Sequence, residues 1–457
     1  MNKSLYIVAF SLAFATTGIA QNNEGQDKTV DLGTQTTTEL RKTQAVSTIY
    51  SDELDKNATT SPYNAIYGLL PGLTVMQNTS WGTDKSRLNV RGRGSLNGDT
   101  PLFVVDGFAR PIEYINLSEI ESISVLKDGA ATALWGGRGA NGVVLITTKR
   151  GMYSKKEIKV DYKFGLGLPV NQPEFADAYT YAKARNEALR YDGLQPDMDE
   201  ASFLAGGNSD LYPNVDWQKE ALRNHTTSHQ LDITFRGGGK RLRYFSVLNY
   251  KNDMGLLNSK YTDYTDRYNS QMKKYFLNLR MNLDVDITDA TKLKLNMLGM
   301  LRETKRPTTS EATLFEQIFN TPSAAFPVQT QNGLWGSNNV LKTNPIANLA
   351  DVGYYKLNQR MLQADLRLIQ DLSVLTRGLS AELAIAYDNN ATYQETAKKS
   401  FMYQTIEKGT DGEPVYTNYG NPNDELEIKN FAVVTSPGEY SRMQSAGEPS
   451  RPARPAS

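Results

Sequence analysis

The sequence predicts a small α/β domain followed by the antiparallel strands of a transmembrane β-barrel. Three observations predict this class. The first 20 residues have the pattern of a secretory signal peptide. Residues 45–151 alternate short apolar runs with Gly and Pro breaks, which is typical of short strands and helices packed in one globule. After residue 151, long segments alternate strictly between apolar and polar residues, as membrane-spanning strands do.

The N-terminal 44 residues divide into a signal peptide and an arm. Residues 1–20 place Lys3 before a short apolar stretch and end in small residues at Ala20, so we expect the mature chain to begin at Gln21. A transmembrane anchor is the alternative, but the apolar stretch is too short to span about 30 Å of hydrocarbon. Residues 21–44 are polar and predict a flexible arm. Export of a chain with 0 cysteines indicates a bacterial envelope protein that does not rely on disulfides.

The α/β domain is predicted from short apolar segments that end at turn residues. We expect strands at 73–75, 87–91, 101–105, 120–126 and 142–148, and a helix at 128–134. The predicted core consists of the apolar residues of these strands, namely Leu102, Val104, Val105, Ile123, Val125, Val144 and Ile146. This is the composition of a small globule with its own core.

The barrel strands are predicted from a period of two. In the clearest segment, residues 277–287, Leu277 and Leu279 share one face while Asn278 and Arg280 share the other. Such segments run to about 9–13 residues, whereas a membrane strand needs about 9–11 and a soluble strand averages about 5–6. The 25 tyrosines suit a membrane interface. A soluble β-sandwich gives the same alternation and remains the alternative.

The connections between these segments also follow the barrel pattern. A tight turn at residues 289–290 contrasts with a long excursion at 302–361, and barrels have short turns on one side and long loops on the other. A helix predicted at 175–191 is expected in a loop outside the membrane.

Composition and motifs exclude several functions. Lys plus Arg and Asp plus Glu are both 50, which gives no basic excess for nucleic acid. The glycines at 137, 139 and 142 spell G-x-G-x-x-G but precede a strand, so we expect a tight turn and no nucleotide site. His225 and His229 have no third ligand nearby in the sequence and predict a solvated pair. We therefore expect no catalytic residues, no metal and no cofactor, and no enzyme activity.

Five segments carry a resemblance to a known family. They read YNAIYGLLPGLTVM at 63–76, RLNVRGRG at 87–94, PLFVVDG at 101–107, IESISVLKD at 120–128 and GRGANGVVLITTKRG at 137–151. Together they closely resemble the plug domain of TonB-dependent outer-membrane transporters of the SusC/RagA type found in Bacteroidota. Several linked motifs in the same order make this match far more specific than the glycine triplet.

The resemblance implies a plug at residues 45–151 that closes a barrel in the cell outer membrane. It implies a TonB-type energy-transducing partner, a SusD-type surface lipoprotein, and a small nutrient ligand such as a glycan or peptide. The segment that resembles the TonB contact is Asp27, Lys28, Thr29, Val30, Asp31 and Leu32, for which a plain linker is the alternative. The loop between two plug strands is the candidate substrate loop, formed by Ser95, Leu96, Asn97, Gly98, Asp99 and Thr100.

The sequence departs from the family after the plug. We expect an incomplete barrel at 152–435, with about eight strands, whereas a plugged transporter barrel has about 22. Residues 436–457 lack alternation, which predicts an aberrant tail from a frameshift or a truncation. The chain is therefore expected to be an N-terminal fragment of a nutrient importer that does not transport on its own. The alternative is a secreted soluble β-rich binding protein with a plug-like domain.

Overall fold

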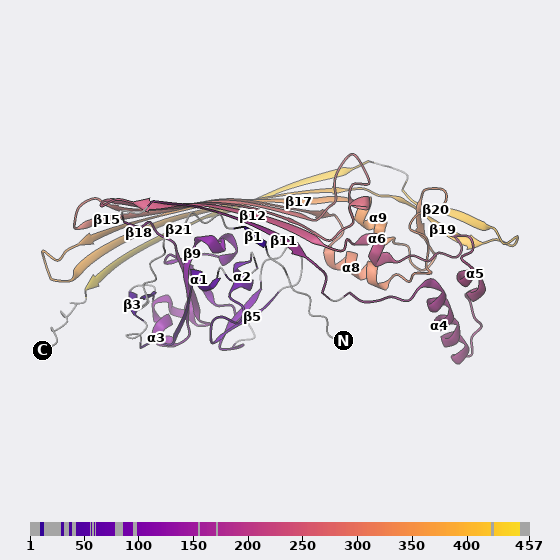
Figure 1. The fold of residues 1–457 in the computed structure, drawn as a ribbon, viewed down its shortest axis with the longest axis horizontal. Helices are drawn as coiled ribbons and strands as arrows, with labels where there is room; N and C mark the ends of the chain where they lie inside the picture. The colour runs from indigo at the N-terminus through magenta and orange to yellow at the C-terminus, as the bar shows by residue number, and fades with distance from the viewer. Residues whose placement is uncertain are drawn as a thin grey trace.

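The structure, a computed structural model, contains an α/β domain that packs against a large curved antiparallel sheet (Figure 1). It describes residues 10–12, 29–31, 36–38, 43–54, 56, 59, 61–77, 86–94, 98–153, 156–170, 172–421 and 425–447. The predicted fold class, an α/β domain followed by an incomplete set of antiparallel barrel strands, is confirmed.

The α/β domain is built on a five-stranded sheet with the strand order β4-β9-β10-β7-β8. Its strands are β4 (Val46–Tyr50), β7 (Leu102–Val105), β8 (Phe108–Ala109), β9 (Ile120–Leu126) and β10 (Val143–Thr148), of which only β10 and β7 pair in parallel. A separate hairpin joins β5 (Leu73–Met76) to β6 (Arg87–Val90). The helices are α1 (Ser51–Leu54), α2 (Pro62–Ala65) and α3 (Gly129–Thr132), with 3-10 turns η1 (Ile112–Tyr114), η2 (Leu117–Glu119) and η3 (Ala133–Gly139).

The core of this domain is the predicted one with a single difference. Six of the seven predicted residues are buried, whereas Leu102 is partly buried and packs against the edge of a smaller cluster around Val104 and Leu145. Leu102 is the first residue of β7, so it lies at the end of the sheet. The glycine triplet forms the expected turn: Gly142 has φ +89°, and a Cβ there would lie 2.8 Å from the side chain of Val90.

Asp128 ties the start of the helical segment to the N-terminal strand. Its Oδ1 accepts a hydrogen bond from the backbone N–H of Ala131 at 2.8 Å, which caps α3, and its Oδ2 accepts one from Ala45 at 2.8 Å. The hydrogen bond from Ala45, followed by that from Ala131, holds the pKa of Asp128 below its ordinary value although partial burial opposes this.

We predict that Asp128→Ala destabilises the α/β domain by about 1 kcal/mol at neutral pH, because one helix cap is lost. A depressed folded-state pKa contributes stability above the unfolded value of about 3.9 and loses it as the pH falls through the folded value. The difference between wild type and variant should therefore shrink below about pH 3.9. Thermal unfolding at neutral pH and below about pH 3.9 measures this difference in stability. Asp52→Ala is the control, because Asp52 is exposed. An equal difference at both pH values would contradict the role of the charged carboxylate.

The large sheet contains eight long strands after residue 156, each antiparallel to its neighbours. They are β11 (Glu157–Gly167), β12 (Thr226–Gly238), β13 (Leu242–Met254), β14 (Lys273–Asp286), β15 (Thr291–Pro307), β17 (Gly353–Asp371), β18 (Leu379–Lys398) and β21 (Glu427–Gly447). Within the part of the chain that the structure describes, β11 and β21 do not pair with each other, so the sheet is open.

Three short strands lie in the N-terminal region. The strand β1 (Phe10–Leu12) pairs with β11 and lies within the predicted signal peptide, whose other residues are outside the described ranges. The strand β2 (Thr29–Asp31) pairs with β3 (Thr36–Thr38). The signal peptide at residues 1–20 stays a prediction.

The C-terminal strand extends further than the sequence pattern indicates. β21 pairs with β18 as far as Gly447, so the predicted start of the aberrant tail at residue 436 lies inside a strand. Strand pairing uses backbone groups, which every residue type except proline supplies in full, so it does not require alternation. Residues 448–457 lie outside the described ranges, and the frameshift or truncation stays a prediction.

The long connections gather at one end of the large sheet, shown at the right of Figure 1. They carry α4 (Ala178–Tyr191), α5 (Glu200–Ala205), α6 (Trp217–Ala221), α7 (Ser259–Thr262), α8 (Glu311–Asn320), α9 (Pro345–Ala350) and a small sheet of β16 (Trp335–Ser337), β19 (Met402–Lys408) and β20 (Pro414–Gly420). The predicted helix at 175–191 is α4. Trp217, Leu314 and Ile346 belong to a second core between these loops. At the opposite end, β14 and β15 join by the predicted tight turn.

Among the described residues, no helix combines the length and the apolar character needed to cross a membrane.

Candidate functional site: the interface between the α/β domain and the large sheet

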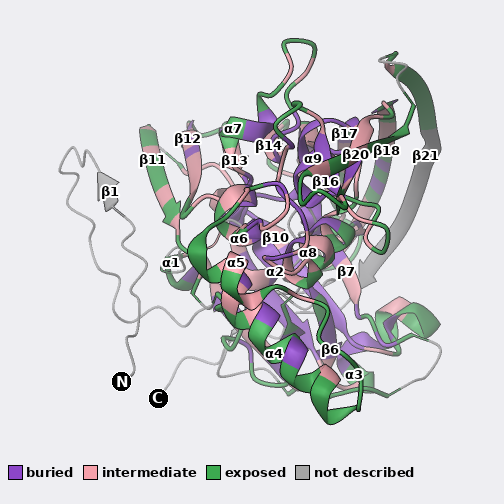
Figure 2. Cartoon of the chain, turned by 90° about the vertical axis from the view of Figure 1, so that its right-hand side faces the viewer, coloured by how far each residue is buried: buried purple, intermediate pink, exposed green. Residues whose placement is uncertain are grey.

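The large sheet buries its polar face and exposes its apolar face. In β14, Asn278, Arg280 and Asn282 are buried, whereas Leu277 and Leu279 are exposed. The same apolar exposure recurs across the sheet at Val160, Tyr162, Leu248, Tyr250, Leu362, Leu366, Ile385 and Tyr387. Figure 2 shows the buried residues gathered between the two edges β11 and β21. A soluble sandwich packs its apolar faces against each other, and this sheet has the reverse polarity.

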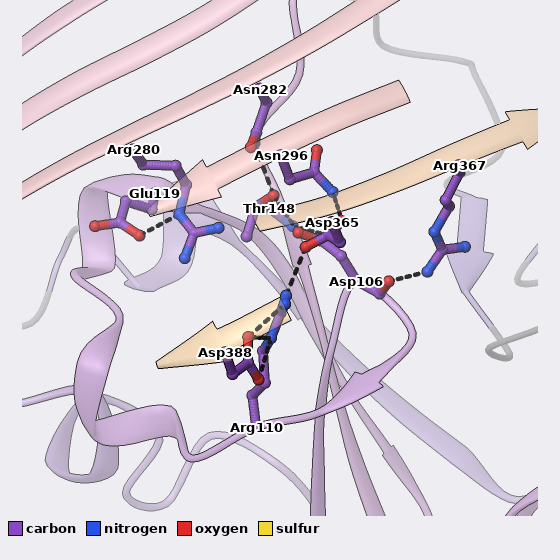
Figure 3. A network of polar contacts seen from close by, with 10 residues as sticks. All are labelled: Asp106, Arg110, Glu119, Thr148, Arg280, Asn282, Asn296, Asp365, Arg367 and Asp388. Carbon is purple, nitrogen blue, oxygen red and sulfur yellow. Dashed lines mark hydrogen bonds and ion pairs between the residues drawn. The ribbon is translucent and has the colours of Figure 1, made fainter. Parts of the chain in front are cut away.

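The first contact between domain and sheet is a buried ion pair. Nε of Arg280 donates to Oε2 of Glu119 at 2.5 Å, and the two side chains are 2% and 0% exposed (Figure 3). Glu119 ends η2, where it completes a capping box with Asn116, and it also accepts a hydrogen bond from Asn278. Burial raises the pKa of Glu119, and the Arg280 guanidinium opposes that shift. The pair is therefore a rigid, water-excluded attachment of η2 to β14.

The second contact is centred on Arg110, which follows β8. Its Nη1 donates to Asp365 at 2.6 Å and its Nη2 donates to Asp388 at 2.8 Å, so one guanidinium joins the neighbouring strands β17 and β18. Asp365 also accepts from Asn296 of β15 at 2.5 Å. Burial alone would lower the pKa of Arg110, but the two carboxylates outweigh burial and raise it. The arginine therefore remains charged and paired.

The third contact is made by the turn of residues 106–107 (Figure 3). The carboxylate of Asp106 accepts from the backbone N–H of Thr148 at 3.0 Å and from its hydroxyl at 2.7 Å, and that hydroxyl accepts from Asn282 at 2.8 Å. The backbone oxygen of Asp106 accepts from Arg367. Burial would raise the pKa of Asp106, but Arg150, Arg280 and the hydrogen bonds from Thr148 hold it below its usual value. Gly107 leaves room for Arg367, which a Cβ would displace.

The comparisons with known proteins agree with this geometry. The model of the TonB-dependent Receptor Plug Domain matches residues 38–143. The TonB-dependent receptor SusC of Bacteroides thetaiotaomicron is 30% identical over 255 residues, which are 52% of this chain and 24% of SusC. The TonB-dependent receptor P26 of Formosa agariphila is 28% identical over 281 residues, or 60% of this chain and 26% of that receptor. Residues 38–143 therefore match the plug domain of TonB-dependent receptors, and the chain is similar in sequence to SusC-type members.

The fold of this chain also matches a solved structure. The RagAB peptide importer in its closed-closed state aligns with a TM-score of 0.63 at 16% identity, over 88% of this chain and 52% of that chain. This chain therefore spans about a quarter of its curated relatives and about half of the solved structure. The α/β domain is the plug, and the large sheet has the fold of part of the surrounding barrel.

The structure describes half of each predicted binding segment. Of the TonB segment, Thr29, Val30 and Asp31 form β2, while Asp27, Lys28 and Leu32 lie outside the described ranges. Of the substrate loop, Gly98, Asp99 and Thr100 are described, while Ser95, Leu96 and Asn97 are not.

Asp99 of the substrate loop has partners inside the plug. It is 5% exposed, and its carboxylate accepts from Arg87 at 2.8 Å and from Asn89 at 3.2 Å. Asp99 and Thr100 line an open cleft of about 740 Å³ together with Tyr63, Phe103 and Arg138. These two are the described residues of the predicted substrate loop that line this cleft, and ligand contact by the loop stays a prediction.

The two histidines lie at the start of β12: His225 is exposed and directly precedes the strand. His229 lies in β12, where its Nδ1 is 2.7 Å from the Tyr162 hydroxyl and its ring lies near Phe164.

Sequence reasoning did not single out the contact residues of the plug interface. A sequence signal marks Arg280 and Asp365, since both lie on the polar faces of long alternating segments. No sequence pattern marks Glu119 and Arg110, because each lies just beside a short strand, where many exposed charges also occur.

Proposed function

We propose that this chain forms the plug and part of the barrel of an outer-membrane importer for nutrients such as oligosaccharides or peptides. The names of two similar proteins support this class: one is SusC, and the other is the RagAB peptide importer. In this proposal the plug closes the lumen until energy supplied from the periplasm displaces it.

The observation that carries the proposal is the reversed polarity of the large sheet, with the plug attached to its polar face. Exposed strands with an apolar outer face are stable where lipid covers that face. A polar inner face with a small globule attached to it is the arrangement of a wide barrel with a plugged lumen. Arg280 and Asp365, both 2% exposed on that inner face, are paired with the plug residues Glu119 and Arg110. We therefore place the chain in the cell outer membrane.

The N-terminal arm is the proposed contact for a TonB-type protein. Residues 27–32 include the short strand β2, and an extended segment can add a strand to the edge of a partner's sheet. The arm leads directly into β4, an edge strand of the plug sheet. A pull on the arm would therefore reach the plug at an edge. A SusD-type lipoprotein is the proposed partner at the end with the long loops.

Replacing residues 27–32 with a Gly-Ser segment of equal length should abolish nutrient uptake while export and assembly remain unchanged. The replacement keeps the reach of the arm but removes the side chains that a partner would recognise. Growth on the transported nutrient measures uptake in cells in which the full-length gene carries the replacement. The same replacement at residues 21–26 is the control and should leave uptake intact. Normal uptake with residues 27–32 replaced would show that this segment is only a linker.

A further inference from the structure

We propose that a basic cluster on the outer face of the large sheet, formed by Lys273, Lys305, Lys356 and Arg360, binds the phosphate groups of outer-leaflet lipids. The inference rests on the proposed function, because it requires the apolar face of the sheet to lie in a membrane. It adds a binding site on the lipid side of the wall, away from the plug and the lumen.

The three lysines lie side by side across three neighbouring strands. In the antiparallel register, Lys273 of β14 is opposite Lys305 of β15, and Lys305 is opposite Lys356 of β17. Side chains alternate between faces. Lys273 is four residues from the exposed Leu277, and Lys305 is four residues from the exposed Leu301. All three lysines therefore share the outer face, directly beyond the apolar band.

The cluster holds more positive than negative charge. The carboxylate of Glu303 lies 3.0 Å from the ammonium group of Lys305 and 3.5 Å from that of Lys356, so it forms ion pairs with both lysines. Glu395, opposite Lys356, accepts a hydrogen bond from the Tyr354 hydroxyl at 2.5 Å. Four cations thus face two carboxylates. Like charges directly opposite each other destabilise a sheet, so an anion that bridges them would stabilise this edge of the apolar band.

The position of the cluster matches the level of lipid headgroups. Tyr275, Tyr354 and Tyr393 lie on the same outer face at this level, as interfacial tyrosines of barrels do. The guanidinium of Arg360 lies 5.2 Å from the Tyr393 ring centre, which holds it beside the apolar surface. Among the described strands, this end carries α8 and α9, whereas the other end of β14 is a tight turn. Long loops mark the outer side of the membrane.

Phosphate is the ligand chemistry that fits. Three lysine ammonium groups and one arginine guanidinium supply only hydrogen-bond donors. Their hydrogen bonds are stronger when the acceptor is ionised, as phosphate oxygens are. Basic clusters beside a membrane attract anionic headgroups in the same way. The side chains of Lys305 and Lys356 are 36% and 30% exposed. Their ammonium groups are therefore accessible from the headgroup layer.

The test compares lipid binding by the full chain in detergent. Native mass spectrometry with bisphosphorylated lipid A should show retained lipid, and dephosphorylated lipid A should be retained less. The variant K273Q/K305Q/K356Q should retain at least about tenfold less phosphorylated lipid than wild type. The matched control K159Q/K163Q/K292Q removes three lysines from the opposite face and should bind as wild type does.

The outcomes separate this inference from the proposed function. Hydroxyl-radical footprinting of Leu277 and Tyr387 reports whether detergent covers the apolar face. If these residues are unprotected in detergent, the membrane placement fails and the lipid site fails with it. If they are protected but the triple variant retains phosphorylated lipid as wild type does, only the lipid site is overturned. Equal loss in the control variant would also overturn it, since the effect would then follow net charge alone.

Discussion

Arg280→Met should weaken the attachment of the plug to the large sheet by about 3–5 kcal/mol, because it leaves Glu119 buried without its partner. Glu119 is 0% exposed where the plug contacts the sheet. The remaining hydrogen bonds, from Asn278 and from the Asn116 backbone, are too few to replace a guanidinium. Hydrogen exchange of the β9 and β10 amides in the full chain measures the loss, which should appear as faster exchange throughout both strands.

A matched pair on the surface provides the control. Arg185 and Asp197 are also 2.5 Å apart, but they are 46% and 47% exposed, so Arg185→Met should cost less than about 1 kcal/mol. The double variant Glu119→Gln with Arg280→Met removes both charges and should recover much of the attachment. If Arg280→Met and Arg185→Met had the same small effect, the buried pair would not hold the plug.

Val104→Asp should unfold the plug, because it places an unpaired carboxylate in an interior strand of the five-stranded sheet, where it is fully buried, at a cost of several kcal/mol. Val104 is 0% exposed and packs with Val143 and Leu145 of the parallel neighbour β10. A domain of this size has a total stability of about 5–15 kcal/mol, so one such change removes a large part of it. Limited proteolysis of the full chain should then cleave within residues 45–151.

Met76→Asp is the control for this variant. Met76 lies in β5 of the same domain but is 57% exposed, so a carboxylate there stays in water and should leave the protease pattern unchanged. A Val104→Asp chain whose plug resisted protease and melted cooperatively would contradict the predicted core.

Much of the fold could be predicted because its signals are local. Alternation in residues 277–287 predicted that Leu277 and Leu279 would lie on one face and Arg280 on the other, and the structure has them exposed and buried in that order. The turn at residues 289–290 was readable from the break between two alternating segments. The small sheet of β16, β19 and β20 was not predicted. Its short strands lie in long loops and pair through contacts that leave no periodic pattern in the sequence.

The candidate site divides in the same way. Period-two patterning is a property of neighbouring residues, so the sequence sufficed to predict the long strands and which of their residues share a face. The plug was predicted from linked motifs between residues 63 and 151, which are also contained in the sequence itself. The pairing of Arg280 with Glu119 joins residues 161 apart, and that of Arg110 with Asp388 joins residues 278 apart. The row of Lys273, Lys305 and Lys356 likewise depends on the strand register. Such pairings depend on the strand register and on the position of the plug against the sheet. Both are set by packing between residues far apart in the sequence, so only the tertiary structure identifies them.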